Sequence, residues 1–68
     1  MLKDMTVGER IKAYAEEHGI MQKYLAEKAG ISTSQMSLVL NGKNNLNVIQ
    51  YYNVCKALGV PMEFFVEV

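Results

Sequence analysis

The chain has 68 residues, of which half are hydrophobic, and its seven basic and seven acidic side chains cancel. A chain of this length suits one small domain, which we expect over residues 1–68 with a core of about residues 6–65. The zero net charge gives no support of its own for a polyanionic partner, and the single cysteine, Cys55, excludes an internal disulfide framework.

A membrane or secreted location is also disfavoured. No stretch approaches the roughly 18 consecutive apolar residues of a membrane span. The N-terminus, MLKDMTVGER, carries charges where a signal peptide needs its apolar region. We therefore expect a cytoplasmic protein that does not enter a membrane.

The first expected helix begins after Thr6. Thr6 and Glu9 have the spacing of a capping box, in which each side chain accepts a hydrogen bond from the backbone N–H of the other residue. Gly19 ends the segment. Between these limits, residues suited to one inward face recur at helical spacing: Val7, Ile11, Tyr14, Ala15 and His18.

Two short helices are expected next, over about residues 22–29 and 33–40. Gly30 ends the first because glycine readily adopts positive φ, and Ser32 is a good N-cap for the second. Ala26 and Gly30 are expected to let the two helices cross closely. Five apolar side chains would hold the pair together: Leu25, Ala29, Ile31, Met36 and Val39.

The fourth and fifth helices follow a polar loop. Asn47 and Gln50 have capping-box spacing, and Gly59 followed by Pro61 ends the fourth helix. Its apolar stripe is expected to comprise Val48, Tyr51, Tyr52, Cys55 and Leu58. Pro61 opens a last short turn, PMEFF, in which a phenylalanine closes the core. These elements, with no strand-like alternation, predict an all-α, compact five-helix bundle.

The second and third helices, joined across a glycine, have the plan of a helix-turn-helix unit. The third carries hydroxyl and amide side chains but no charged one. Once its apolar residues face inward, the remaining side chains must project outward: Thr33, Ser34, Ser37, Leu38 and, at the end, Asn41. Such a face is often merely solvated, but the helix-turn-helix frame favours a binding role. Residues 21–60 also contain four lysines and only one acidic residue.

Residues 22–43, followed by NVIQYYNVCKALGVP, resemble the Cro and phage-repressor (XRE) family of DNA-binding domains. The matching positions are, in order, Gln22, Leu25-Ala26, Gly30-Ile31-Ser32, Asn41-Gly42-Lys43 and Ala57-Leu58-Gly59-Val60. The resemblance covers nearly the whole chain. It implies a lambda-repressor-like bundle of five helices, with the helix-turn-helix at helices two and three. It also implies a phage or prokaryotic regulator that binds duplex operators in a sequence-specific way, usually as a dimer.

Carried over position by position, the resemblance implies two sets of contacts with double-stranded DNA. Base edges in the major groove would be met by Thr33, Ser34, Ser37 and Leu38. The sugar–phosphate backbone would be met by Gln22, Ser32, Asn41, Lys43, Asn44 and Asn45.

Hydroxyl groups discriminate weakly between bases, whereas Leu38 can pack on the methyl group of thymine, so we expect half-sites rich in A·T pairs. A role of Leu38 as a protein contact remains an alternative. Three positions depart from the residues usual in the family: Met21, Leu38 and Leu40.

A lone domain with few lysines should bind DNA weakly at physiological salt. We therefore expect a homodimer, at least on DNA, with half-sites about 34–36 Å apart. The sequence ends after the fifth helix, so no separate oligomerisation domain is expected. The apolar end FFVEV supplies the candidates for the self-contact: Phe64, Phe65, Val66 and Val68. Core closure is the alternative role of Phe64.

Three functions fit these features. The first is a transcriptional regulator, most often a repressor; the second is the antitoxin of a toxin–antitoxin pair; the third is a protein-interaction module on the same fold. A toxin or an antirepressor would then be a protein partner. An enzyme is not expected, and neither is a cofactor or metal, because the chain has one histidine, no phosphate-binding glycine loop and no metal-ligand cluster.

Overall fold

The computed structural model describes residues 6–66. This part of the chain contains four α-helices and one 3₁₀ turn, joined by short loops. In chain order these are α1 (Val7–Glu17), α2 (Gln22–Ala29), α3 (Thr33–Leu40), α4 (Val48–Leu58) and η2 (Met62–Phe65). The described residues contain no strand, so the all-α prediction is confirmed. The five-helix count is not confirmed, because the fifth element is a 3₁₀ turn of four residues after Pro61.

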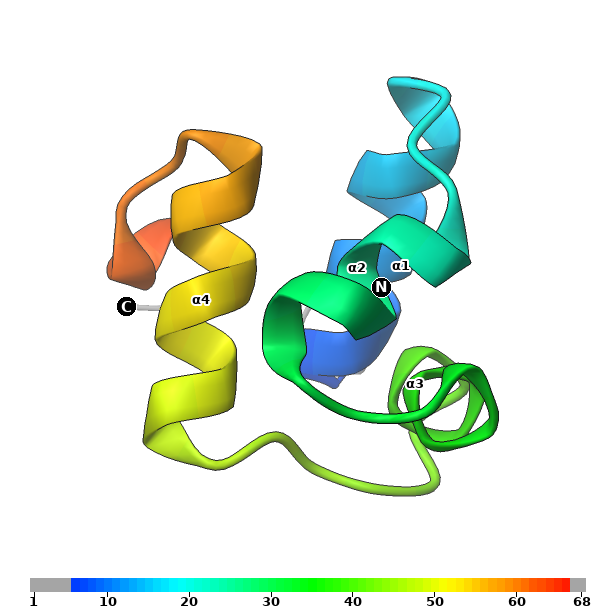
Figure 1. Ribbon diagram of the computed structural model, residues 1–68. Helices are drawn as coiled ribbons and strands as arrows, with labels where there is room; N and C mark the ends of the chain where they lie inside the picture. The colour runs from blue at the N-terminus through cyan, green and yellow to red at the C-terminus, as the bar shows by residue number, and fades with distance from the viewer. Residues whose placement is uncertain (1–5, 67–68) are drawn as a thin grey trace.

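Within the helix-turn-helix pair, α2 packs against both α4 and α3, and α3 packs against α1 (Figure 1). In this view α3 is seen nearly end-on at the lower right, and the chain that leaves it runs along the lower edge to the start of α4 on the left. The 3₁₀ turn folds back beside α4. This arrangement leaves one side of α3 and most of the α3–α4 loop on the outside of the molecule, while Leu46 packs against the core.

Side-chain caps determine where three of the helices begin. Capping boxes join Thr6 to Glu9 at α1 and Asn47 to Gln50 at α4, as the spacing predicts. A third box joins the predicted cap Ser32 to Gln35 at the start of α3. By contrast, α2 begins at Met21 without any side-chain cap.

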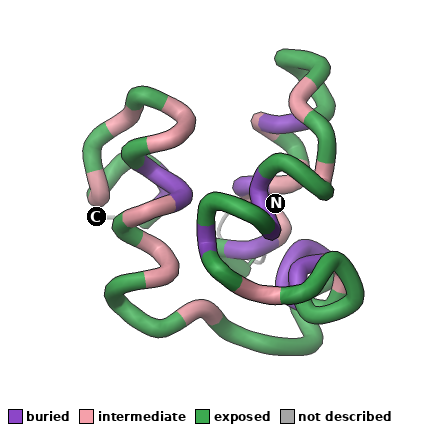
Figure 2. Tube along the Cα trace, viewed as in Figure 1, coloured by how far each residue is buried: buried purple, intermediate pink, exposed green. Residues whose placement is uncertain are grey.

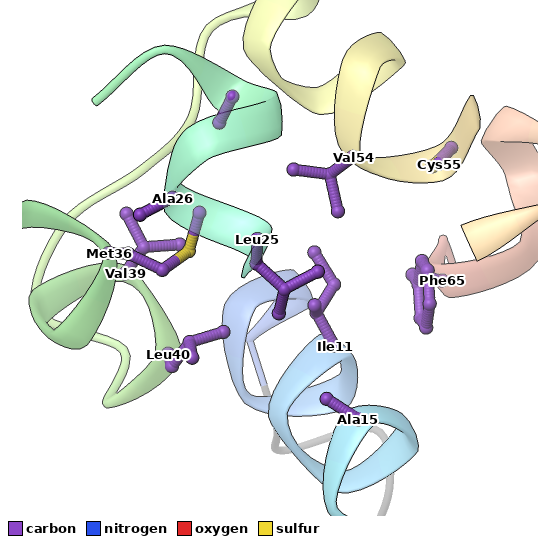
Figure 3. Close-up of a cluster of buried hydrophobic side chains, with 11 residues drawn as sticks. Ile11, Ala15, Leu25, Ala26, Met36, Val39, Leu40, Val54, Cys55 and Phe65 are labelled. Carbon is purple, nitrogen blue, oxygen red and sulfur yellow. The ribbon is translucent and has the colours of Figure 1, made fainter. Parts of the chain in front are cut away.

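The core draws side chains from all four helices (Figure 3). Its largest completely buried side chains are Ile11, Leu25, Met36, Val54 and Cys55. Figure 3 shows Ile11 and Leu25 facing each other at the centre, with the α3 side chains on one side and Phe65 on the other. Burial of these apolar side chains is the main force that fixes the relative orientation of the helices.

One face of α4 differs from the prediction. Val48 and Tyr52 were expected inside, but they are 74% and 48% exposed. Val54, which the predicted stripe omitted, is completely buried. The inward residues are therefore Tyr51, Val54, Cys55 and Leu58, which follow the i, i+3, i+4, i+7 pattern of a single helical face.

The two glycines nearest to helix–helix contacts differ from the prediction: Gly30 makes no close contact, whereas Gly8 makes one that the sequence did not predict. Gly30 ends α2 with φ +76°, but a Cβ at this position would meet nothing within 4 Å. Gly30 therefore allows the left-handed turn and has no part in a close crossing, although Ala26 is buried as predicted. The tight contact is at Gly8, where a Cβ would lie 1.9 Å from the backbone oxygen of Val39. That contact brings α1 against α3.

Three contacts hold η2 against the helices. The hydroxyl of Tyr51 donates to the backbone oxygen of Met62, and burial raises the pKa of Tyr51 to about 12. Nη1 of Arg10 donates to the backbone oxygen of Phe65 at 3.1 Å. The ring of Tyr14 packs edge-on against Phe65, with the centroids 5.6 Å apart.

These contacts change the set of dimer candidates. Phe65 is only 4% exposed, because its side chain closes the core, so it has almost no surface for a second subunit. Phe64 and Val66 remain 51% and 46% exposed. Val68 lies outside the described residues.

Candidate nucleic-acid interface

The outer face of α3 is polar and open to solvent. Met36, Val39 and Leu40 are buried against the other helices. The predicted base-contacting residues lie on the remaining surface: Thr33, Ser34 and Leu38 are exposed and Ser37 is half-buried. Figure 2 shows that buried and exposed residues alternate along this helix. Their contact with DNA bases stays a prediction, but none of the four is hidden in the core.

One hydrogen bond links the start of α2 to the start of α3. Nε2 of Gln22 donates to the backbone oxygen of Thr33 at 3.1 Å. The predicted phosphate donor therefore also has a structural role that the sequence did not reveal. Because a primary amide carries two N–H groups, one of them remains for a second acceptor. The absence of a side-chain cap at Met21 leaves the first backbone N–H groups of α2 open to an anion.

The α3–α4 loop holds the other predicted backbone contacts. The side chains of Lys43, Asn44 and Asn45 are exposed. The loop folds back on α3, because the backbone N–H of Lys43 donates to the oxygen of Leu38 at 2.8 Å. Its Gly42 lies against the start of α1, where a Cβ would come 3.2 Å from Cδ of Glu9 and 3.3 Å from Oγ1 of Thr6. The loop that carries Lys43 is therefore held by α3 and by the start of α1.

Sequence reasoning missed one residue beside the predicted interface, Lys12 on α1. Its Nζ donates to Oδ1 of Asn41 at 3.1 Å, and Nδ2 of Asn41 donates to the backbone oxygen of Ser37 at 2.8 Å. Lys12 is 29 residues from Asn41 in the chain, so no local spacing could have paired them. The structure therefore adds a cation from α1 next to the C-terminal end of α3.

Several surface grooves lie among the residues that the structure describes. One of them has a volume of about 270 Å³ and lies where α1, the α3–α4 loop and α4 meet, with Val7, Leu46, Val48, Tyr51 and Val66 among its lining residues. No group of three or more His, Cys, Asp or Glu residues within 6–66 is arranged to hold a metal ion. Cys55 is buried in the core, and this burial raises the pKa of its thiol.

None of the helices in residues 6–66 combines the length and the apolar character that crossing a membrane requires.

Comparison with known proteins finds relatives that are named as transcriptional regulators or as a repressor. The chain is 37% identical over 62 residues to the immunity repressor protein of Bacillus phage phi105, and 31% identical over 62 residues to a transcriptional regulator in the ATPase CF(0) region of Rhodospirillum rubrum. It is 33% identical over 64 residues to an HTH-type transcriptional regulator of Sinorhizobium medicae. These alignments cover 91–94% of the chain but only 43–57% of the relatives, so the chain spans about half of their length.

No solved structure matches the chain significantly. Residues 11–65, however, match the family described as "Helix-turn-helix", and this segment includes α2, α3 and the turn between them. The match covers well over half of the sequence and agrees with the observed geometry of the two helices. The chain therefore belongs to the helix-turn-helix family.

Proposed function

We propose that the chain forms one sequence-specific domain that binds double-stranded DNA and represses transcription by occupying operator half-sites as a dimer. In this proposal α3 enters the major groove, and α2 and the α3–α4 loop contact the flanking phosphates. The observation that carries the proposal is the exposed, uncharged polar face of α3, presented beside the uncapped start of α2. The names of the relatives, which include a phage immunity repressor, support the repressor role.

The uncharged recognition surface has a consequence for affinity. Lysines supply the sequence-independent part of DNA binding by releasing counterions, whereas hydroxyl groups and Leu38 contribute mainly to the choice of bases. Lys12 and Lys43 both lie near the C-terminal end of α3, and with so few lysines at the proposed interface one subunit has few phosphate contacts to offer. A second subunit on the next half-site would double them. The exposed Phe64 and Val66 are the proposed self-contact, together with Val68.

A DNA-binding assay that compares a double substitution on α3 with a control substitution on α4 tests this proposal. The duplex should comprise the DNA upstream of the gene that encodes the chain, compared with a mixed-sequence duplex at low and physiological salt. We expect the double substitution Thr33→Ala and Ser34→Ala to remove most of the preference for the upstream duplex, because both hydroxyls lie on the outer face of α3. Lys56→Gln, on the last turn of α4, is the control and should keep the preference.

The alternatives give different results. A protein that shifts no duplex even at low salt would contradict the proposal and fit the protein-interaction module. An antitoxin would bind DNA and also capture the toxin encoded next to it. A protein that binds every duplex equally, and whose double substitution changes nothing, would contradict the sequence-specific role of α3.

A further inference from the structure

The longest polar side chain of α3, that of Gln35, lies at the edge of the exposed face of the helix. Because an α-helix has about 3.6 residues per turn, Gln35 lies on its surface between Leu38, three residues later, and Val39, four residues later. Leu38 is exposed and Val39 is buried, and Gln35 itself is exposed. Gln35 therefore flanks the outer face of α3 and does not stand at its centre.

Gln35 also belongs to the longest-bonded of the three capping boxes in residues 6–66. The backbone N–H of Ser32 donates to its Oε1 at 3.4 Å, whereas the equivalent bonds to Glu9 in α1 and Gln50 in α4 measure 2.8 Å and 3.0 Å. A distance of 3.4 Å exceeds the usual range of about 2.7–3.2 Å for an N–H···O bond. The side chain of Gln35 therefore loses little when it turns toward another partner.

The amide of Gln35 presents hydrogen-bond donors to the surroundings. A backbone N–H can only donate, so Oε1 faces Ser32 and Nε2 faces away from it. Neither N–H of Nε2 has a hydrogen-bond partner among residues 6–66. A glutamate here would cap the helix at least as well, because a carboxylate is favoured at a helix N-terminus. It would, however, offer no donor and would repel a phosphate.

We propose that Gln35 is a further DNA-contacting residue of α3, whose Nε2 donates to a phosphate oxygen at the wall of the major groove. The inference rests on the proposed function and adds a residue to its interface. The major groove is about 12 Å wide and a helix with its side chains about 10–12 Å across. A helix that fills the groove directs its outermost line, here Ser34 and Leu38, toward the bases and its flanks toward the backbones.

A phosphate contact and a base contact have different consequences. A neutral amide that donates to a phosphate strengthens binding to every sequence by a similar factor, because phosphates carry no sequence information. A glutamine that reads a base edge, for example adenine, strengthens binding to some sequences only. The assignment to phosphate can therefore be tested by comparing duplexes that differ in single base pairs.

The experiment measures fluorescence anisotropy at several salt concentrations. The probes are the duplex from upstream of the gene and duplexes that differ from it by one base pair. For Gln35→Glu we expect an affinity at least about tenfold lower for every duplex, the effect of losing a hydrogen bond to a charged group. The midpoint of urea unfolding should equal or exceed that of the wild type, because a carboxylate strengthens the cap. These opposite changes would exclude a fold defect as the cause of weaker binding.

Gln35→Lys tests the same contact by a gain. A cation on this flank of α3 would neutralise the phosphate and release a counterion. The slope of log affinity against log salt should therefore steepen by about 0.9 per subunit, equally for every duplex. A variant that failed to fold could not produce this gain.

Gln50 supplies the matched control, because it is also a glutamine at the third position of a capping box. It belongs to α4, outside the proposed interface. Gln50→Glu and Gln50→Lys make the same changes of charge and should leave the affinity and the slope close to the wild-type values.

The different failures are distinguishable. If the Gln35 variants change the affinity and the slope no more than the Gln50 variants do, the inference is wrong and the proposed function stands. If they change the preference between duplexes, Gln35 meets a base and the assignment to phosphate is wrong. If the wild type binds no duplex, the proposed function is wrong and this inference falls with it.

Discussion

Of the glycines in the described part of the chain, Gly8 has the least room for a side chain. It lies in the first turn of α1, and a Cβ there would come 1.9 Å from the backbone oxygen of Val39 on α3. A backbone atom cannot move aside as the end of a flexible side chain can, so the two helices would have to separate. No sequence pattern revealed this contact, because a glycine in a helix identifies no partner.

We expect Gly8→Ala to lower the free energy of unfolding by about 1–3 kcal/mol, as overpacking of a tight contact does. Urea denaturation followed by circular dichroism measures the change. Because Val39 belongs to α3, the substitution should also weaken DNA binding in proportion to the displacement of that helix.

Gly30 is the matched comparison, since it has open space around it but a left-handed φ of +76°. Gly30→Ala should lower the free energy of unfolding by about 1–2 kcal/mol through backbone strain alone. Gly30→Asn should lower it less, because asparagine tolerates this conformation. Equal effects of alanine and asparagine at position 30, or no effect of Gly8→Ala, would contradict these assignments.

At the scale of the elements, the sequence predicted helix limits better than helix faces. The caps Thr6, Ser32 and Asn47 and the terminators Gly30 and Gly59 are local features, and the structure has each of them in the expected role. The buried face of α4 could not be predicted in the same way, because this helix carries apolar residues on more than one face. Periodicity alone could not choose between two adjacent stripes; packing against α2 and η2 does so.

Val54 and Val48 make this difference measurable within one helix. Val54→Ala removes two methyl groups from a completely buried site and should cost about 1.5–3 kcal/mol of stability. Val48→Ala, at a site that is 74% exposed, should change stability by no more than about 0.5 kcal/mol. Urea denaturation of both variants gives the comparison. The reverse order would support the stripe that the sequence predicted.

At the scale of the whole molecule, the fold class and the family could be predicted, whereas the details of the interface could not. The helix-turn-helix frame depends on glycines, caps and apolar spacing, all of which are visible in the sequence. The bonds from Gln22 to Thr33 and from Lys12 to Asn41 depend on the tertiary arrangement of α1, α2 and α3. The same holds for Phe64 and Phe65, which are adjacent in the chain but differ completely in burial.

The zero net charge of the whole chain makes the salt dependence of DNA binding informative. If Lys43 contacts a phosphate, Lys43→Gln should reduce the slope of log affinity against log salt by about 0.9 per subunit, equally for all duplexes. Fluorescence anisotropy at several salt concentrations measures the slope. Lys56→Gln, on α4, should leave it unchanged. An unchanged slope for Lys43→Gln would exclude this lysine from the phosphate contacts.

The position of Gly42 couples two segments that are far apart in the chain. Its backbone lies directly against Thr6 and Glu9, the pair that starts α1. Fraying of the first turn of α1 would take away the surface on which the α3–α4 loop rests. Conversely, a duplex that immobilises this loop should slow the fraying of α1. The first turn of α1, although it contacts no base in this proposal, would thus also become less mobile when the protein binds DNA.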